Sequence, residues 1–212
     1  MYFRTEAVIL SHRDFQEADR ILTTFTRDFG KVTVLARGVR RPKSRKSGHV
    51  ELGNWCKVFI AKGKNLDLLT EVETKRAFGI ADFDSSKANK IYHLLELVEN
   101  LTEEKQKNLS VFILLVNFLK RIVDGEDFNL ISCVFKTKLL SALGFFSAKN
   151  LKDSKAKKLL DMLEQADFKK IKEEVKLNAN HYLKLLAFLD SMIENLTERK
   201  LKTVRFLDGA ET

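Results

Sequence analysis

Cationic side chains crowd into one short stretch of this sequence. Between Asp28 and Glu51 there is no acidic residue, yet six arginines and lysines fall within positions 37–46 and another lysine precedes them. The seven are Lys31, Arg37, Arg40, Arg41, Lys43, Arg45 and Lys46. A guanidinium can bind a phosphate through two parallel hydrogen bonds, and an ammonium adds a compact positive charge. These residue types at this density are suited to binding the phosphates of a polyanion.

The cationic stretch cannot lie in a hydrophobic core, because each unpaired buried charge would cost several kcal/mol. It is therefore either a solvated loop without a partner or a loop that binds an anionic chain. Its place between two predicted strands of a small β-barrel favours binding, since such barrels often bind single-stranded nucleic acid on one face. We predict that the seven cations contact DNA.

The distribution of charge supports this prediction. The net charge is +9, and residues 1–80 contribute +7 of it while residues 81–212 contribute +2. Positive charge concentrated in one part of a protein attracts an extended anion. Four nearby aromatic residues could stack on bases, although a core position is more typical of each, so none is predicted as a base contact. They are Phe15, Phe29, Trp55 and Phe59.

No pattern of catalytic, metal-binding or cofactor-binding residues is evident. His12, Asp14, Glu17 and Asp19 match no metal-binding loop, and the interleaved arginines predict surface ion pairs instead. Cys56 and Cys133 are 77 positions apart and predict two buried, reduced thiols. The common nucleotide-binding and hydrolase motifs are missing. We therefore predict no catalytic residue, no metal and no cofactor.

Hydropathy argues against a membrane protein. The longest apolar stretch, residues 109–119, is too short to span a bilayer, and the N-terminus has no secretory pattern. A content of 44% hydrophobic and 32% charged residues is typical of a globular protein. We expect a cytoplasmic, nucleoid-associated location.

Glycine spacing divides the chain into a β-rich and a helical part. Six of nine glycines lie within the first 80 residues, where alternating apolar patterns predict five strands. The predicted strands cover residues 3–10, 20–26, 31–36, 55–61 and 66–75. Five short strands fit a small barrel, with half of a β-sandwich as the alternative.

A helical period of 3.6 residues replaces the alternating pattern from Ser85 onward. It predicts helices over residues 85–101, 103–123, 127–143 and 182–196, with a further helix capped by Asp153. We place the boundary near residues 79–86, giving a domain of residues 1–80 and a helical domain of residues 81–212. The expected fold class is α+β.

Five segments together resemble the RecO family of bacterial DNA repair proteins. RDFQEADR (13–20), TRDFGK (26–31) and ARGVRRPKS (36–44) match its N-terminal domain. FKTKLLSALGF (135–145) and RKLKTVRFL (199–207) resemble its helical signature and C-terminal element. The resemblance implies an OB-fold barrel, binding of single- and double-stranded DNA, and annealing of complementary strands. It also implies pairing with RecR and help for RecA in replacing single-strand-binding protein, whose acidic C-terminal tail these proteins can contact.

The sequence departs from the family at one place. Many members have a four-cysteine zinc site after the segment that matches residues 135–145, but no cysteine lies near Phe145 here. We predict no zinc finger, and residues 146–176 are the least guided by the family. Two alternatives remain: an adaptor whose basic loop binds an acidic protein tail without DNA, and a nuclease, which would require clustered carboxylates.

Overall fold

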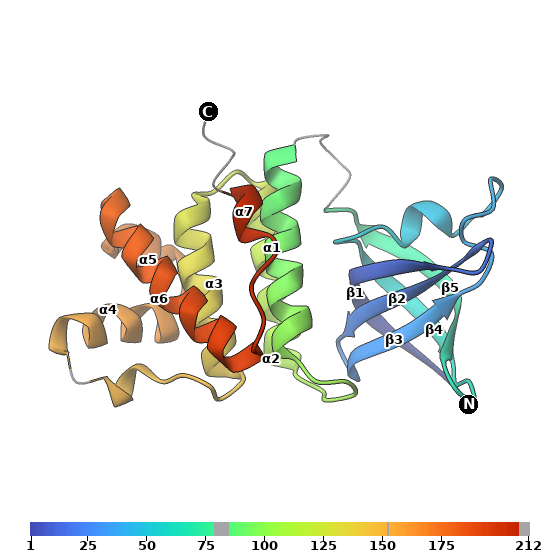
Figure 1. The fold of residues 1–212 in the computed structure, drawn as a ribbon, viewed down its shortest axis with the longest axis horizontal. Coiled ribbons are helices and arrows are strands. Elements are labelled where there is room, and N and C mark those ends of the chain that lie inside the picture. The colour runs from blue at the N-terminus through green and yellow to red at the C-terminus, as the bar shows by residue number, and fades with distance from the viewer. Residues whose placement is uncertain (79–84, 152, 208–212) are drawn as a thin grey trace.

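The computed structural model describes residues 1–78, 85–151 and 153–207. A β-barrel formed by the N-terminal part packs against a group of helices formed by the rest (Figure 1). The predicted order of strands followed by helices is therefore confirmed. The predicted domain boundary falls largely on residues 79–84, which lie outside the described residues.

Five strands close the barrel in the order β1-β2-β3-β5-β4. They are β1 (Tyr2–Phe15), β2 (Asp19–Thr26), β3 (Gly30–Ala36), β4 (Trp55–Ala61) and β5 (Asp67–Arg76). All neighbouring pairs are antiparallel except β3 and β5. The closed five-stranded barrel confirms the predicted fold and excludes the half-sandwich. Strand β1 is five residues longer at its C-terminal end than predicted, because its second half pairs only with β2.

The helical part contains four longer helices and three shorter ones among the described residues. They are α1 (Ser85–Leu101), α2 (Leu109–Val123), α3 (Phe128–Ala142), α4 (Ser154–Gln165), α5 (Phe168–Glu174), α6 (Ala179–Thr197) and α7 (Val204–Leu207). Asp153 caps α4 as predicted. The prediction that the second helix begins at residue 103 is wrong. Asn108 caps α2 by accepting from the Val111 amide, so α2 begins at Leu109.

The barrel has a hydrophobic core of its own and also contributes residues to a second core that it shares with the helices. In the run Ala7–Leu10 every residue is buried, because alternate side chains point to opposite faces of a strand and here both faces are covered. Ala7 and Ile9 belong to the barrel core, whereas Val8 and Leu10 pack in the cluster that includes α1 and α2. None of the described helices is both long and apolar enough to cross a membrane.

His93 on α1 predicts that the protein loses stability in mild acid. Its ring is buried, and Nδ1 lies 2.7 Å from Thr203 Oγ1, while Nε2 has no hydrogen-bond partner among the described residues. Burial, and secondarily the charge of Lys136, hold the pKa of His93 well below its ordinary value of 6.5. The folded protein therefore keeps His93 neutral at pH values where the unfolded chain binds a proton.

Because the unfolded state binds more protons below pH 6.5, the free energy of unfolding falls as the pH drops through that value. Down to pH 5 the contribution of His93 is at most about 2 kcal/mol, at about 1.4 kcal/mol per pH unit. Urea titrations between pH 7.5 and pH 5 measure this slope. The His93→Gln variant should have a shallower pH dependence than the wild type, and equal slopes would contradict the assignment.

Candidate nucleic-acid interface

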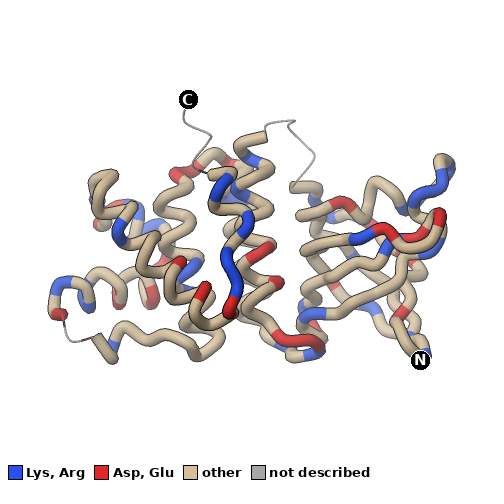
Figure 2. Tube along the Cα trace, in the orientation of Figure 1, with Lys and Arg blue, Asp and Glu red and all other residues tan. Residues whose placement is uncertain are grey.

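The cationic stretch lies in the long connection between β3 and β4. Figure 2 shows Lys and Arg along its tip, at the end of the barrel that is remote from the helices. Two hydrogen bonds tie the start of the connection to the β1–β2 turn. Asp19 Oδ1 accepts from the Gly38 amide at 2.7 Å, and the Arg40 amide donates to the Ala18 carbonyl at 2.9 Å. Gly38 has φ +64°, which a residue with a side chain adopts at a cost.

Four of the predicted DNA-binding cations are free to bind an anion. Arg37, Arg41, Lys43 and Arg45 are all exposed. Within the described residues, none of these four side chains makes an ion pair or a hydrogen bond. They are called the loop cations below. An exposed cation without an internal carboxylate partner keeps its full charge for an external phosphate.

Arg40 and Lys46 anchor the connection to the barrel. The Arg40 guanidinium lies 3.3 Å from Asp14 Oδ2 and also donates to the carbonyls of Gln16 and Glu17. Lys46 Nζ donates to the Leu69 carbonyl at 3.4 Å, and partial burial lowers the pKa of Lys46. These two side chains shape the loop in addition to contributing charge.

Lys31 lies apart from the other six predicted residues. Its Nζ donates to the Glu99 carbonyl at 2.7 Å, near the C-terminal end of α1. A cation at this end of a helix satisfies a free carbonyl and complements the helix dipole. The structure thus places Lys31 at the contact between barrel and helices and does not bring it together with the loop cations.

An exposed aromatic ring lies beside two of the loop cations. Phe15, Arg37 and Arg41 line a surface hollow of about 750 Å³ between the β1–β2 turn and the start of the connection, together with the acidic residues Glu17 and Asp19. Phe15 is 39% exposed. The sequence favoured a core position for it, but the mostly polar residues on both sides of it, at 11–14 and 16–20, were a signal for exposure. An exposed ring between cations can stack on a base while the cations bind the adjoining phosphates.

The other candidate aromatic residues have partners within the protein. Phe29 packs on Phe3 with ring centroids 4.3 Å apart. The Trp55 indole donates to Glu6 Oε2 at 3.1 Å and has Lys75 Nζ 3.9 Å from its ring centroid. Phe59 stacks on Tyr2 beside a second hollow of about 650 Å³. Carboxylates outnumber cations four to three in the lining of that hollow, which makes it less favourable for a polyanion.

The acidic residues near the site act as partners of its arginines. Asp14 lies 3.2 Å from Arg20 and 3.3 Å from Arg40, which confirms the predicted surface ion pairs for Asp14, whereas Glu17 and Asp19 form no ion pair within the described residues. The two cysteines are buried and free, as predicted. Burial raises the pKa of Cys56 to about 11 and that of Cys133 to about 12, so both thiols are protonated at neutral pH.

Comparisons with known proteins agree with this architecture. The family model for the recombination protein O N-terminal region matches residues 1–78, and the model for its C-terminal region matches residues 86–147. The DNA repair protein RecO of Roseiflexus sp. is 34% identical over 143 residues, or 68% of this chain and 50% of that protein. RecO of Pelotomaculum thermopropionicum is 32% identical over 143 residues, or 68% of this chain and 56% of that protein.

A third relative gives the same result. RecO of Caldicellulosiruptor bescii is 33% identical over 143 residues, covering 68% of this chain and 59% of that protein. The matched part of the chain thus spans little more than half the length of these relatives. The two family models follow each other in the expected order, the first over the barrel and the second over α1 to α3. The chain belongs to the RecO family.

Proposed function

We propose that this chain is a recombination mediator of DNA repair that binds single- and double-stranded DNA and anneals complementary strands. The observation that supports this most directly is the group of four exposed loop cations without internal partners, two of which line a hollow with Phe15. Phosphate contacts of this kind position a strand without reading its sequence, as annealing of any complementary pair requires.

The mechanism is electrostatic. Cations between two strands screen the repulsion of their phosphates, so that base pairing supplies the driving force and neither nucleotide hydrolysis nor a catalytic side chain is needed. We assign DNA contact to the barrel domain, residues 1–80, and partner contact to residues 81–212. By analogy with the family, the partners are RecR and the acidic tail of single-strand-binding protein, with RecA loaded as the outcome. The corresponding location is the cytoplasm, at the nucleoid.

Removal of the loop cations tests the DNA-binding part of the proposal. The loop variant replaces Arg37, Arg41, Lys43 and Arg45 with Gln. The control variant replaces four exposed, unpaired lysines of the helical part with Gln and so changes the net charge by the same amount as the loop variant. These lysines are Lys158, Lys169, Lys176 and Lys184. Fluorescence anisotropy with labelled oligothymidylate at several salt concentrations measures the affinity of each protein for a single strand.

If about six phosphates are neutralised, the wild-type log–log salt slope is about −4, and loss of four contacts makes it about 3 units shallower. The control variant should keep the wild-type slope and an affinity within a few fold. An unchanged slope in the loop variant would place the DNA-binding site elsewhere. No wild-type binding to naked DNA, together with binding to an acidic peptide, would support the adaptor instead.

A strand-annealing assay tests the activity itself. Complementary oligonucleotides, free or coated with single-strand-binding protein, should pair faster with the wild-type protein than alone. The loop variant should lose this acceleration while the control variant retains it. Equal pairing rates with and without the wild-type protein would contradict the proposed function.

A further inference from the structure

A second group of unpaired cations lies at the C-terminal end of the described chain. Residues 199–207, called the C-terminal strip below, follow α6 and contain no acidic residue. The cations are Arg199, Lys200, Lys202 and Arg205. All four are exposed, and none forms an ion pair with any carboxylate of the described residues. The strip lies beyond the segments that the two RecO family models match.

Helix α1 fixes the backbone of the strip. Glu96 on α1 accepts from the Lys202 amide at 2.8 Å and from the Thr203 amide at 3.0 Å, and the Thr203 hydroxyl donates to the same carboxylate at 2.5 Å. Glu194 on α6 accepts from the Leu201 amide at 3.1 Å. Figure 1 shows the strip running along α1 in front of the helix.

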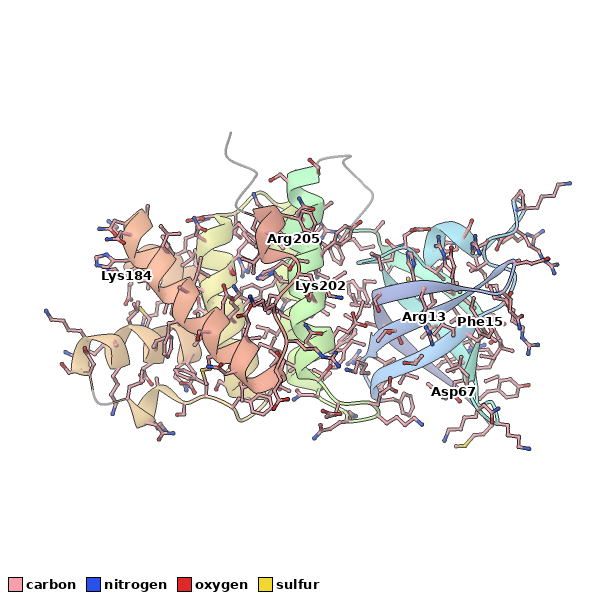
Figure 3. The ribbon with its side chains drawn as sticks, viewed as in Figure 1. Arg13, Phe15, Asp67, Lys184, Lys202 and Arg205 are labelled. Carbon is pink, nitrogen blue, oxygen red and sulfur yellow. The ribbon has the colours of Figure 1, made fainter. Side chains whose placement is uncertain are left out.

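Side chains of the strip divide between the core and the solvent. Leu201 is only 6% exposed and belongs to the core, whereas its neighbours Lys200 and Lys202 are exposed. Figure 2 shows the resulting blue segment in front of α1, and Figure 3 labels Lys202 and Arg205 there. Because folding has already ordered the backbone, an anion that binds these side chains meets a smaller entropic cost.

An aromatic ring completes the strip. Phe206 is 48% exposed, and the Arg205 guanidinium lies 4.6 Å from its ring centroid. The combination repeats that of Phe15 with Arg37 and Arg41 at the barrel. Cations with an accessible ring match a single strand, whose phosphates and unpaired bases bind the two kinds of group respectively. An acidic peptide has charge for the cations but no base to stack on the ring.

We propose that the C-terminal strip is a second binding site for a single strand of nucleic acid. This inference rests on the proposed function and specifies where the second strand binds during annealing. The loop cations hold one strand at the barrel, and the strip holds another on the helical part of the same chain. Figure 3 shows Phe15 of the first site on the barrel and Lys202 of the second site in front of α1.

The test compares the number of strands that each variant binds. The strip variant replaces Arg199, Lys200, Lys202 and Arg205 with Gln; it should fold, because Glu96 and Glu194 contact only backbone amides and Thr203 in this segment. Titration of the full chain with an oligothymidylate of about 12 nucleotides, a length suited to one OB barrel, gives the stoichiometry. Circular dichroism verifies that the strip variant folds. If it does not fold, the double variant Lys200→Gln/Lys202→Gln, which removes only two of the four charges, is used in its place.

The wild type and the control variant should bind twice as many strands per chain as either the strip variant or the loop variant. Annealing by the strip variant should slow at least tenfold although it still binds one strand. Wild-type stoichiometry and annealing rate in the strip variant would overturn the second site while leaving the proposed function intact. Polyglutamate serves as a probe for binding of an acidic peptide. If the strip variant lost polyglutamate binding but kept the wild-type strand stoichiometry, the strip would be a peptide-binding site and the second strand site would be overturned. Failure of the wild type to bind or anneal strands would refute the proposed function instead.

Discussion

Replacement of Asp190 with Ala is expected to lower the free energy of unfolding by about 3–5 kcal/mol. Asp190 on α6 lies 2.5 Å from Nζ of Lys136 on α3, and the Lys136 side chain is only 2% exposed. The contact is an ion pair between the Lys136 ammonium and the Asp190 carboxylate. Without Asp190 the Lys136 ammonium would remain buried with no carboxylate partner, and that uncompensated charge is the source of the loss.

The pH dependence of this loss identifies its cause. Burial lowers the pKa of Lys136, and Asp190 opposes that effect, so the Asp190→Ala variant should have a still lower Lys136 pKa. A base with a lowered pKa in the folded state gains stability as the pH rises toward its unfolded value, because the unfolded chain binds more protons. Urea unfolding should therefore show a smaller difference from the wild type at pH 9.5 than at pH 7.

The double variant Lys136→Met/Asp190→Leu is the matched control. It removes both charges and fills the space with apolar groups, so its stability should equal or exceed that of the wild type. A loss below about 1 kcal/mol in Asp190→Ala would contradict the assignment, since a solvated pair contributes no more than that. The result also concerns the C-terminal strip, because the strip follows α6 and this pair connects α6 to α3.

The barrel could be predicted well from the sequence because its signals are local. Alternating apolar residues and glycine-containing turns defined β4 residue for residue, at 55–61. The second half of β1 escaped prediction because residues 11–15 lack apolar alternation and owe their extended form to pairing with β2. Residues 103–108 were wrongly predicted as helix because their structure also depends on a distant contact. Their path is set by contact with the barrel, where the Lys105 amide donates to the Lys31 carbonyl at 2.8 Å.

The sequence predicted which residues make the candidate site basic, but not which of them bind within the protein and which remain free for a ligand. A run of cations shows that a loop is basic, whereas the partner of each cation depends on residues distant in sequence. Asp14 is 26 positions from Arg40, and Glu99 is 68 positions from Lys31. Sequence alone therefore grouped structural and free cations together. The sequence identified the strip only as a segment that resembles the family. Its ordered backbone depends on a hydrogen bond to Glu96, which lies more than 100 positions away in the sequence.

Gly30 should be the residue whose substitution most affects the contact between barrel and helices. It has φ +70°, and a Cβ atom added there would lie 2.0 Å from the Gln106 carbonyl oxygen. Real Cβ atoms do not approach a backbone atom so closely, so Gly30→Ala must push residues 102–108 off the barrel. The displaced contacts include the Lys105–Lys31 backbone hydrogen bond and the Thr33–Glu104 side-chain hydrogen bond.

We expect Gly30→Ala to cost about 3 kcal/mol, because about 1 kcal/mol of left-handed backbone strain adds to the loss of these hydrogen bonds. Gly125→Ala is the control: Gly125 has φ +76°, but nothing lies within 4 Å of an added Cβ, so strain alone applies. Unfolding can be followed through Trp55, the single tryptophan, which packs against the core shared by barrel and helices.

Comparison of the two alanine variants separates the contact from the strain. We expect Gly30→Ala to lose about 2 kcal/mol more free energy of unfolding than Gly125→Ala, and this difference measures the contribution of the contact. Equal losses would show that residues 102–108 can move without loss of stability. The loop cations lie in the β3–β4 connection, remote from Gly30, so Gly30→Ala should bind a first strand normally. Annealing should nevertheless slow, because the spacing and orientation of the two proposed strand sites are fixed only while the barrel stays packed against α1. Normal annealing by this variant would show that the fixed arrangement is dispensable.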